Sequence, residues 1–429
     1  MTQLQQAKAG TITTEMKNVA RDEGVDGDWL MKQVAAGEIV IPANRNHKNL
    51  AAVGIGGGLK VKVNSNIGTS PLFIDVDDEM AKLEAALTAG ADAVMDLSTG
   101  GDLDEIRRRM IAACPKPLGT VPMYQVMKEA GDKTKMSMSI YMDVLKRHAE
   151  QGVDFITIHA GVTSRAFGAM DSRLMKSVSR GGALLLAWMA HHNKESFIYE
   201  NFDDVLGLCK DYDITLSLGD GMRPGCLHDA TDQAQLDELR ILGELQQRAV
   251  AEGVQVMIEG PGHVPYNEIE LNVILQKKYC HKAPFYVLGP LPTDIAAGYD
   301  HIACAMGGAL AASKGADFLC YVTPKEHIGL PNVGDVYQGT VVTKIAAHVA
   351  DLARGNPAAL ARDHRMAVAR NNVDWIGMQE ESIDPVTFAE LRRLECEQNP
   401  ELDRANFCSM CGDFCVFESY NPDKKEKGE

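Results

Sequence analysis

The chain has 429 residues, and its 43 Lys and Arg against 59 Asp and Glu give a formal net charge of −16. A hydrophobic fraction of 45% excludes a disordered chain, because it supplies enough apolar material for a core. The acidic balance argues against a broad nucleic-acid-binding surface, which needs clustered Lys and Arg. No apolar run approaches the roughly 18 residues of a membrane span, and the polar N-terminus lacks the apolar segment of a signal peptide. We therefore expect a cytoplasmic protein that binds neither nucleic acid nor membrane.

The first 60 residues are expected to form an N-terminal region with one helix and a short extended stretch at Glu38–Pro42. Eight short β-like runs follow, at Lys62–Asn66, Ala93–Leu97, Pro117–Val121, Phe155–His159, Ile214–Leu218, Val254–Glu259, Pro284–Leu288 and Asp317–Val322. Their apolar, β-branched and aromatic residues are typical of strands buried on both faces.

Segments with helical spacing alternate with these runs, at Asp78–Ala89, Asp104–Ala113, Ser139–Gln151, Gln233–Glu252, Glu268–Lys278 and His301–Lys314. The alternation predicts an α/β fold, a (βα)8 barrel over residues 61–333, with a doubly wound open sheet as the alternative. Although 429 residues would ordinarily suggest about three domains, such a barrel runs to about 250 residues as one unit.

The remaining residues are expected to form two further segments. A helical C-terminal region is predicted over residues 334–405, with helices at Asp335–Arg354, Asp363–Asn371 and Pro385–Leu394. Residues 406–429 carry a cysteine segment and the charged tail PDKKEKGE.

Polar and glycine-rich sequences follow nearly every predicted strand: NIGTS, DLSTGGD, GTVPMY, HAGV, LGDGMRPG, EGPGH, LGPLPTD and YVTPKEH. In a barrel, the C-terminal strand ends and the loops after them build the active site. A purely structural barrel would not need charged and imidazole groups at so many matching ends. The sequence therefore predicts an active site on this face.

Three of the ten cysteines, Cys408, Cys411 and Cys415, lie within eight residues. Three thiolates at this spacing favour a [4Fe–4S] cluster with one iron left open for a substrate such as S-adenosylmethionine. Zinc with a remote fourth ligand and unrelated thiols are the alternatives, because structural zinc usually takes four ligands and no second pair is nearby. The other seven cysteines are scattered and are expected to be structural.

Many ordered motifs now make the chain recognisable, among them VNSNIGTS, VMDLSTGGD, TIHAGV, SRGG, SLGDGMRPG, EGPGHVP, CYVTPKEHIGLP and the terminal CSMC. Together they resemble the ThiC family of radical S-adenosylmethionine enzymes over about residues 10–417. The resemblance implies a carbon–carbon lyase type of radical chemistry on 5-aminoimidazole ribotide. It also implies a C-terminal [4Fe–4S] cluster, S-adenosylmethionine, an electron donor such as flavodoxin or ferredoxin, and a homodimer.

The resemblance also assigns roles to particular residues. The substrate-binding residues would be Asn66, Met95, Tyr124, His159, Ser179, Arg180, Gly181, Asp220, Gly221, Met222, Arg223, Glu259 and Tyr286. Glu259 and Asp220 would be the catalytic groups that move protons. His263 and His327 would bind one mononuclear zinc or iron, and Cys408, Cys411 and Cys415 would bind the cluster. Simpler interpretations stay open: Met95 as core, Tyr124 and Tyr286 as packing aromatics, and Asp220 with Arg223 as a mutual ion pair.

The family has two branches, which make either a pyrimidine phosphate for thiamin or 5-hydroxybenzimidazole for the lower ligand of cobamides (vitamin B12). The chain departs from the expected thiamin-branch motifs at Val61, Ser65, Pro71, Leu72, Phe73, Ala183, Ala297, Ala303, Cys304, Ala305 and Met306. Because most of these positions adjoin the site motifs, we expect an altered pocket and a 5-hydroxybenzimidazole synthase. The alternative is phosphomethylpyrimidine synthase, with the departures as ordinary sequence drift.

Overall fold

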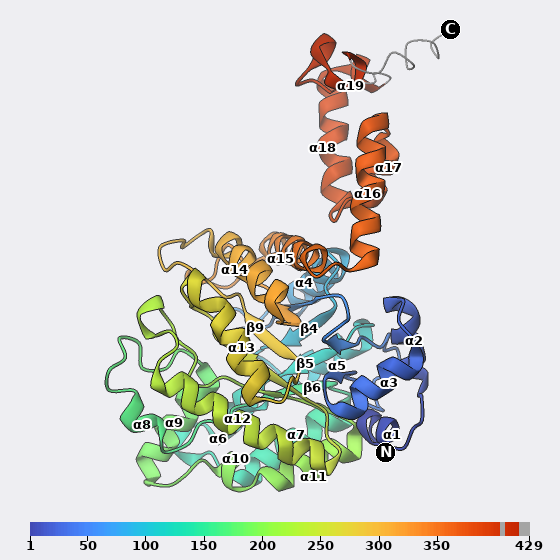
Figure 1. Cartoon of the computed structure of the whole chain (residues 1–429). Helices are drawn as coiled ribbons and strands as arrows, with labels where there is room; N and C mark the ends of the chain where they lie inside the picture. Colours follow the sequence, from blue (N-terminus) through green and yellow to red (C-terminus); the bar gives the residue numbers. More distant parts are fainter. Residues whose placement is uncertain (404–407, 420–429) are drawn as a thin grey trace. The chain divides into compact units, whose positions relative to one another are not determined.

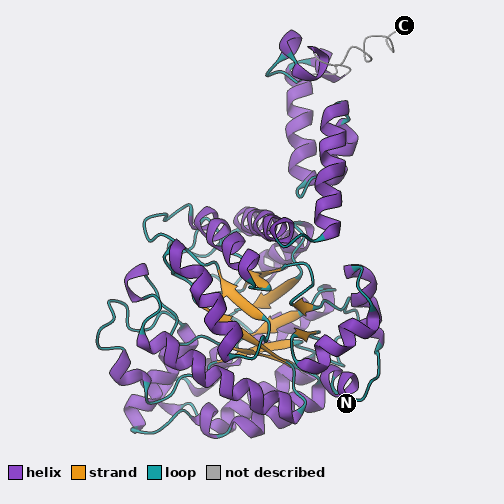
Figure 2. Ribbon diagram, in the orientation of Figure 1, coloured by secondary structure: helices purple, strands orange, loops and turns teal. Residues whose placement is uncertain are grey.

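Eight parallel strands close a barrel in the computed structural model, which describes residues 1–403 and 408–419 (Figures 1 and 2). They are β3 (Lys62–Ile67), β4 (Ala93–Asp96), β5 (Leu118–Thr120), β6 (Phe155–Ile158), β7 (Thr215–Leu218), β8 (Val256–Gly260), β9 (Phe285–Leu288) and β10 (Phe318–Cys320). The ring closes where β10 pairs with β3, with Phe318 opposite Lys62. The predicted (βα)8 barrel is thus confirmed and the open sheet is excluded.

Aromatic side chains fill the barrel interior. The rings of Phe155 and Phe318, from strands on opposite sides of the barrel, meet edge to face at 6.4 Å. Glycines on neighbouring strands make room for such rings: a Cβ on Gly119 would lie 2.2 Å from the Phe155 ring. The barrel is therefore a packed core, and space for a ligand is left only towards the strand ends.

Helices surround the barrel (Figure 1). They are α4 (Val76–Thr88), α5 (Leu103–Ala113), α6 (Pro122–Ala130), η1 (Lys133–Lys135), α7 (Met138–Gln151), α8 (Ala166–Ala169), α9 (Arg180–His192), α10 (Phe197–Glu200), α11 (Phe202–Tyr212), η2 (Leu227–Asp229), α12 (Gln233–Glu252), η3 (Tyr266–Glu268), α13 (Ile269–Tyr279), α14 (Asp300–Lys314) and α15 (Val333–Ala353). Each of the six helices predicted between strands is present, with bounds shifted by at most two residues.

The N-terminal region contains three helices, so the expectation of one helix is wrong. They are α1 (Gln3–Lys8), α2 (Thr14–Glu23) and α3 (Gly27–Ala36), followed by the antiparallel pair β1 (Ile39–Val40) and β2 (Ile55–Gly56). Thr2, Thr13 and Asp26 cap the three helices by accepting hydrogen bonds from backbone N–H groups. Each helix is only six to ten residues long, which leaves little periodic signal in the sequence.

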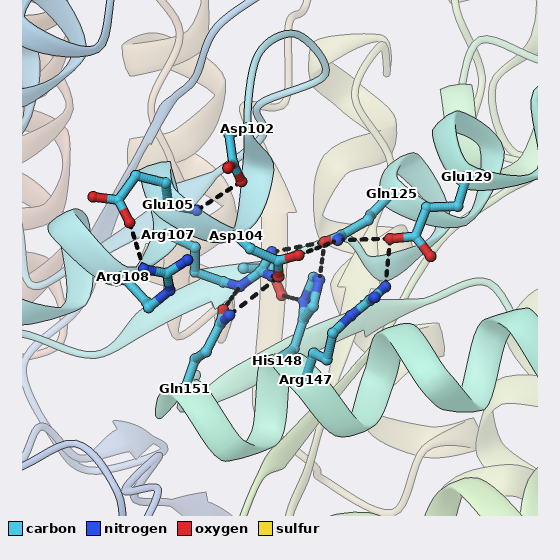
Figure 3. A network of polar contacts seen from close by, with 11 residues as sticks. Asp102, Asp104, Glu105, Arg107, Arg108, Gln125, Glu129, Arg147, His148 and Gln151 are labelled. Carbon is cyan, nitrogen blue, oxygen red and sulfur yellow. Dashed lines mark hydrogen bonds and ion pairs between the residues drawn. The ribbon is translucent and has the colours of Figure 1, made fainter.

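A buried polar network joins α5, α6 and α7 behind β5 (Figure 3). Arg107 donates hydrogen bonds to Gln151, Gln125 and Asp104. His148 bridges Gln125 Oε1 at 2.9 Å and Thr120 Oγ1 on the strand at 2.8 Å. Burial lowers the pKa of His148, and the neighbouring Arg107 and Arg147 lower it further, so the imidazole is neutral. The network therefore fixes three outer helices to the strand they cover.

The chain divides into two compact units, Met1–Ala350 and Asp351–Glu429. The second unit contains α16 (Pro357–Asn372), α17 (Trp375–Glu381), α18 (Pro385–Gln398), η4 (Pro400–Asp403), η5 (Gly412–Phe414) and α19 (Val416–Ser419). Within it, the Arg392 guanidinium lies 3.9 Å from the centre of the Trp375 ring. The helical, cysteine-bearing C-terminal region is thus confirmed, while the four-segment domain scheme stays a prediction, and residues 404–407 and 420–429 of its last segments lie outside the described residues.

None of the described helices combines the length and the apolar character that crossing a membrane requires.

Candidate functional site

A cavity of about 90 Å³ lies at the carboxyl ends of the barrel strands. Among its lining residues are many that the sequence predicted for the substrate: Asn66, Met95, Tyr124, His159, Ser179, Asp220, Arg223, Glu259 and Tyr286. Four others, Arg180, Gly181, Gly221 and Met222, lie within two residues of a lining residue in the sequence and do not line the cavity themselves. Residues from separate strands converge here because parallel strands end at the same rim.

An amide and phenol cluster forms one wall of the cavity. Asn64 Nδ2 donates to Asn66 Oδ1 and to Tyr286 Oη, both at 2.7 Å. Asn66 Nδ2 in turn contacts Cys320 Sγ at 3.0 Å. Burial raises the pKa of the Cys320 thiol to about 12 and raises that of Tyr286 further above its usual range, so both groups are protonated near neutral pH.

Two carboxylates and a guanidinium form an adjoining wall, where Glu259 on β8 pairs in register with Tyr286 on β9. Glu259 Oε1 accepts hydrogen bonds from Thr157 Oγ1 at 2.6 Å and from Ser217 Oγ at 2.8 Å. Arg223 pairs with Asp220 Oδ1 at 3.1 Å, as the ion-pair interpretation expected. Burial raises the pKa of Asp220 to about 7, with Glu259 adding to the shift and Arg223 opposing it. Burial also raises the pKa of Glu259. Carboxyl groups tuned in this way can hold or release a proton near neutral pH.

His159 supplies a neutral imidazole. Burial lowers its pKa to about 3, and the charge of Arg223 contributes. A hydrogen bond of 2.9 Å joins His159 Nε2 to Ser179 Oγ, which also caps α9 by accepting from the backbone N–H of Gly182. The imidazole is thereby held against the first turn of α9.

Glycines of the SRGG and GDGM motifs let three segments meet at this imidazole. A Cβ on Gly181 would lie 2.2 Å from His159 Cε1. A Cβ on Gly182 would lie 2.7 Å from the Cα of Gly221, so here backbone packs on backbone. Gly181 and Gly221 therefore shape the site through close packing, in addition to any backbone contact with a ligand.

Arg180, the first residue of α9, lies over the ring of Tyr124 with its guanidinium carbon 4.9 Å from the ring centre. Tyr124 lines the cavity, whereas Arg180 is exposed. The guanidinium is therefore placed beside the cavity, where an anionic group of a ligand can pair with it.

His263 and His327 lie close together, with ring centres 5.3 Å apart. Each has a carboxylate at Nδ1: Asp294 at 2.8 Å for His263 and Asp300 at 3.4 Å for His327. Such partners orient metal-binding imidazoles and leave Nε2 for the metal. Over residues 1–403 and 408–419, however, no three His, Cys, Asp or Glu side chains gather into a complete metal site.

The three clustered cysteines lie on either side of η5 in the second unit. Partial burial raises the pKa of Cys411, and the thiols of Cys408 and Cys415 add to the shift, so the three groups are electrostatic neighbours. No disulfide joins any of the ten cysteines, all of which belong to the described residues. Three thiols are the donor type that an iron–sulfur cluster takes, although among the residues that the structure describes their side chains are not gathered into a metal-binding arrangement.

Sequence reasoning missed three polar residues that the strands direct to the site: Thr157, Ser217 and Cys320. They lie within apolar runs and look like core residues. Alternate side chains of a barrel strand point into the barrel, and this alternation could have identified them. Thr157 and Ser217 occupy paired positions on β6 and β7, so their side chains point to the same side.

Residues 2–421 match the Radical SAM ThiC family. The chain is 53% identical over 424 residues to "Phosphomethylpyrimidine synthase" of Desulforamulus reducens, covering 97% of each chain. It is 54% identical to the protein of that name from Desulforudis audaxviator, again over 97% of each chain. A solved dihydropteroate synthetase with a bound product is 12% identical, with a TM-score of 0.43, over 74% of this chain and 100% of that chain.

The expectation of a 5-hydroxybenzimidazole synthase is wrong, because these close relatives carry the name of the thiamin branch. The structure gives the physical reason. None of the departing positions is among the residues lining the described cavity. Ser65 points away from it and bonds Thr340 Oγ1 at 2.8 Å, while Leu72, Phe73 and Ala183 are exposed. The departures therefore contribute no side chain to the cavity lining, and the Cys304 side chain contacts a lining residue, Cys320, from behind.

With a match from residue 2 to residue 421 and relatives above 50% identity, the chain belongs to the radical SAM ThiC family.

Proposed function

We propose that this enzyme is a phosphomethylpyrimidine synthase of thiamin biosynthesis. It would convert 5-aminoimidazole ribotide into 4-amino-5-hydroxymethyl-2-methylpyrimidine phosphate by carbon–carbon lyase type chemistry. The observation that carries the proposal is the cavity at the strand ends, where Arg223, two carboxylates and a neutral imidazole converge. The names of the close relatives support the same activity.

The phosphate of the ribotide would bind at the start of α9. Ser179 caps this 13-residue helix by accepting from the Gly182 N–H. The first N–H groups left for an anion are therefore those of Arg180 and Gly181. A helix N-terminus favours an anion, and a guanidinium pairs with phosphate through two donors. Arg180, beside Tyr124, supplies that guanidinium.

The ribose and imidazole would lie against the polar walls. Asn66, Met95 and Tyr286 bound one side, and Met222 and Gly221 support the loop that carries Asp220. Glu259 and Asp220 are the catalytic groups that exchange protons with the substrate, since the pKa of each is raised towards neutrality.

Cys408, Cys411 and Cys415 would hold a [4Fe–4S] cluster, and the family implies S-adenosylmethionine as its partner. When bound, the cluster supplies one electron for the reductive cleavage of S-adenosylmethionine. His263 and His327 would bind one zinc or iron ion, oriented by Asp294 and Asp300.

The proposed setting is the cytoplasm, where thiols stay reduced. A flavodoxin or ferredoxin would donate the electron, and two chains would form a homodimer. The net charge of −16 supports the absence of nucleic-acid and membrane partners.

The test is anaerobic incubation of the reconstituted enzyme with 5-aminoimidazole ribotide, S-adenosylmethionine and a reductant. Mass spectrometry should detect the pyrimidine phosphate, together with methionine. Cys411→Ala should abolish the product, whereas Cys396→Ala, in the same unit and outside the cysteine triad, should retain it. Absence of the pyrimidine phosphate with a fully loaded cluster would refute the proposed function.

A further inference from the structure

A second, smaller cavity lies behind the wall that carries Asp220. It encloses about 20 Å³ and shares Asp220, Glu259 and Gly260 with the site cavity. Its other lining residues come from α12, α13 and neighbouring segments, and they are Gln235, Glu238, Leu239, Leu242, Pro261, Asn272 and Phe285. A water molecule needs roughly 10–15 Å³ and two or more polar partners. The second cavity therefore has room for one water molecule.

Two carboxylate oxygens on this cavity lack a hydrogen-bond partner among the described residues. Asp220 directs Oδ1 to Arg223, which leaves Oδ2 without a partner. Glu238 on α12 accepts a hydrogen bond from the Met222 N–H at 2.8 Å through Oε2, whereas Oε1 makes no hydrogen bond of good geometry and has the backbone N–H of Gly221 nearby. The residues are only 7% and 4% exposed, so bulk water does not serve either oxygen. Buried polar atoms of this kind normally bond an internal water or share a proton.

The charges facing Glu238 favour one proton shared between the two groups. Asp220 repels its ionised form, and Glu259 adds negative charge beyond Asp220. Arg173 is the cation nearest to Glu238 but is bound by both oxygens of Asp232, at 2.7 and 2.8 Å. Arg223 is paired with Asp220. Burial and Asp220 accordingly raise the pKa of Glu238 well above its usual range. Two neighbouring buried carboxyls cannot both ionise readily.

We propose that Asp220 and Glu238 share one proton across a single water molecule held in the second cavity, and that Glu238 is thereby a positioning residue for catalysis. In the transfer, the O–H bond of Glu238 breaks as a proton passes to the water. The water passes one of its own protons to Asp220 Oδ2, and the negative charge moves to Glu238. No electrons are exchanged. Asp220 thus regains a proton after giving one to bound substrate. When Asp220 instead accepts a proton from substrate, a proton passes back through the water to Glu238.

Only the use of this proton in turnover rests on the proposed function, so the first measurement needs no turnover. Infrared spectra of the anaerobic holoenzyme should show a carboxylic-acid C=O band near neutral pH that shifts in D2O. Other buried carboxyls, such as Asp213, also absorb in this region, so the band is read from difference spectra. Wild type minus Glu238→Gln should contain the band, whereas wild type minus Glu244→Gln, a control at an exposed position of the same helix, should not. At alkaline pH the band should vanish from the first difference spectrum.

The second measurement is the pH profile of turnover. Glu238→Gln should lower kcat about tenfold and leave KM within about twofold, because Glu238 does not line the substrate cavity. The alkaline fall in kcat should move to a different pH in this variant, since it then belongs to Asp220 alone.

A wild-type minus Glu238→Gln difference spectrum without a carboxylic-acid band at neutral pH would overturn the proposal. So would an unchanged pH profile of kcat in a folded Glu238→Gln enzyme. A failure of the proposed function looks different, because the wild-type enzyme would then make no pyrimidine phosphate while its infrared band remained.

Discussion

Thr157 on β6 donates a hydrogen bond of 2.6 Å to Glu259 on β8, and so spans the strand β7 that lies between them. Ser217 on β7 donates to the same carboxylate oxygen at 2.8 Å. Three adjacent strands thus position one carboxylate, and the two hydroxyls favour its ionised form against the effect of burial.

Removing the Thr157 hydroxyl should change the pH dependence of the reaction. Thr157→Val keeps the shape of the side chain and loses the donor, so the pKa of Glu259 should rise. If Glu259 must be ionised to accept a proton, the acidic limb of kcat should move to higher pH by the same amount. Ser65→Ala removes a buried hydroxyl that faces away from the cavity and should leave the limb in place. A limb that does not move in Thr157→Val would argue against Glu259 as the base.

A methyl group on Gly181 should displace the imidazole of His159. The new Cβ would fall 2.2 Å from His159 Cε1, so the ring must move by about 1 Å. A misplacement of that size at a reacting site costs on the order of a hundredfold in kcat/KM. Gly168→Ala, where no atom lies within 4 Å of the new Cβ, is the matched control and should be fully active. Steady-state kinetics of both variants test this. If Gly181→Ala were as active as Gly168→Ala, the exact position of His159 would not matter for catalysis.

The buried network of Figure 3 should contribute strongly to stability. Arg107 is 2% exposed at its side chain, so Arg107→Met removes the cation that pairs with Asp104 and one donor from each of two amide oxygens. Breaking a buried ion pair in this way costs about 3–5 kcal/mol. Arg108→Met breaks an exposed pair with Glu105 on the same helix and should cost about 1 kcal/mol or less. Urea unfolding of the two variants should separate these values, and equal losses would contradict the network's role.

Asp213 should make stability depend on pH. Burial raises its pKa to about 7, although it accepts the backbone N–H of Gln3 at 2.9 Å. Since the unfolded value is near 3.9, the folded state binds more protons between about pH 4 and pH 7, and stability falls as the pH rises through that window. Asp213→Asn suits the left-handed backbone at this position and should flatten the decline. Urea midpoints at pH 5 and pH 8 test this. The explanation would be refuted if the urea midpoint of the wild type rose relative to that of the variant between pH 5 and pH 8.

His263 and His327 should together bind a metal ion that is distinct from the cluster. His263→Asn or His327→Asn should abolish binding of one divalent ion per chain, followed as the visible absorption of added Co²⁺. The sulfide content of the cluster should not change. His228→Asn, an exposed histidine, should bind Co²⁺ as the wild type does. Undiminished Co²⁺ binding in both pair variants would remove these histidines from the metal site.

The barrel could be predicted because each strand is a short apolar run followed by a glycine-rich polar sequence. The runs at Phe155 and Phe285 lie within one or two residues of the observed strands. Convergence of Asn66, His159 and Glu259 then follows from parallel topology alone, since all strand ends share one rim.

Other features could not be read from the pattern. Helix α9 begins with Arg180-Gly181-Gly182, whose paired glycines argue against a helix. Tertiary packing explains them, because Gly181 lies against His159 and Gly182 against Gly221.

The prediction of a 5-hydroxybenzimidazole synthase failed for a related reason. A residue close to a site motif in the sequence can point into the barrel or away from it. Ser65 points away and bonds Thr340.

The contact between Gly182 and Gly221 has a consequence for how this enzyme can change. Because a side chain at either glycine would meet the other segment's backbone, neither segment can gain bulk without a matching shift in its partner. Grafting one of them from a relative would therefore succeed only when the other is carried along. The SRGG and GDGM motifs, about forty residues apart, should therefore change together during evolution.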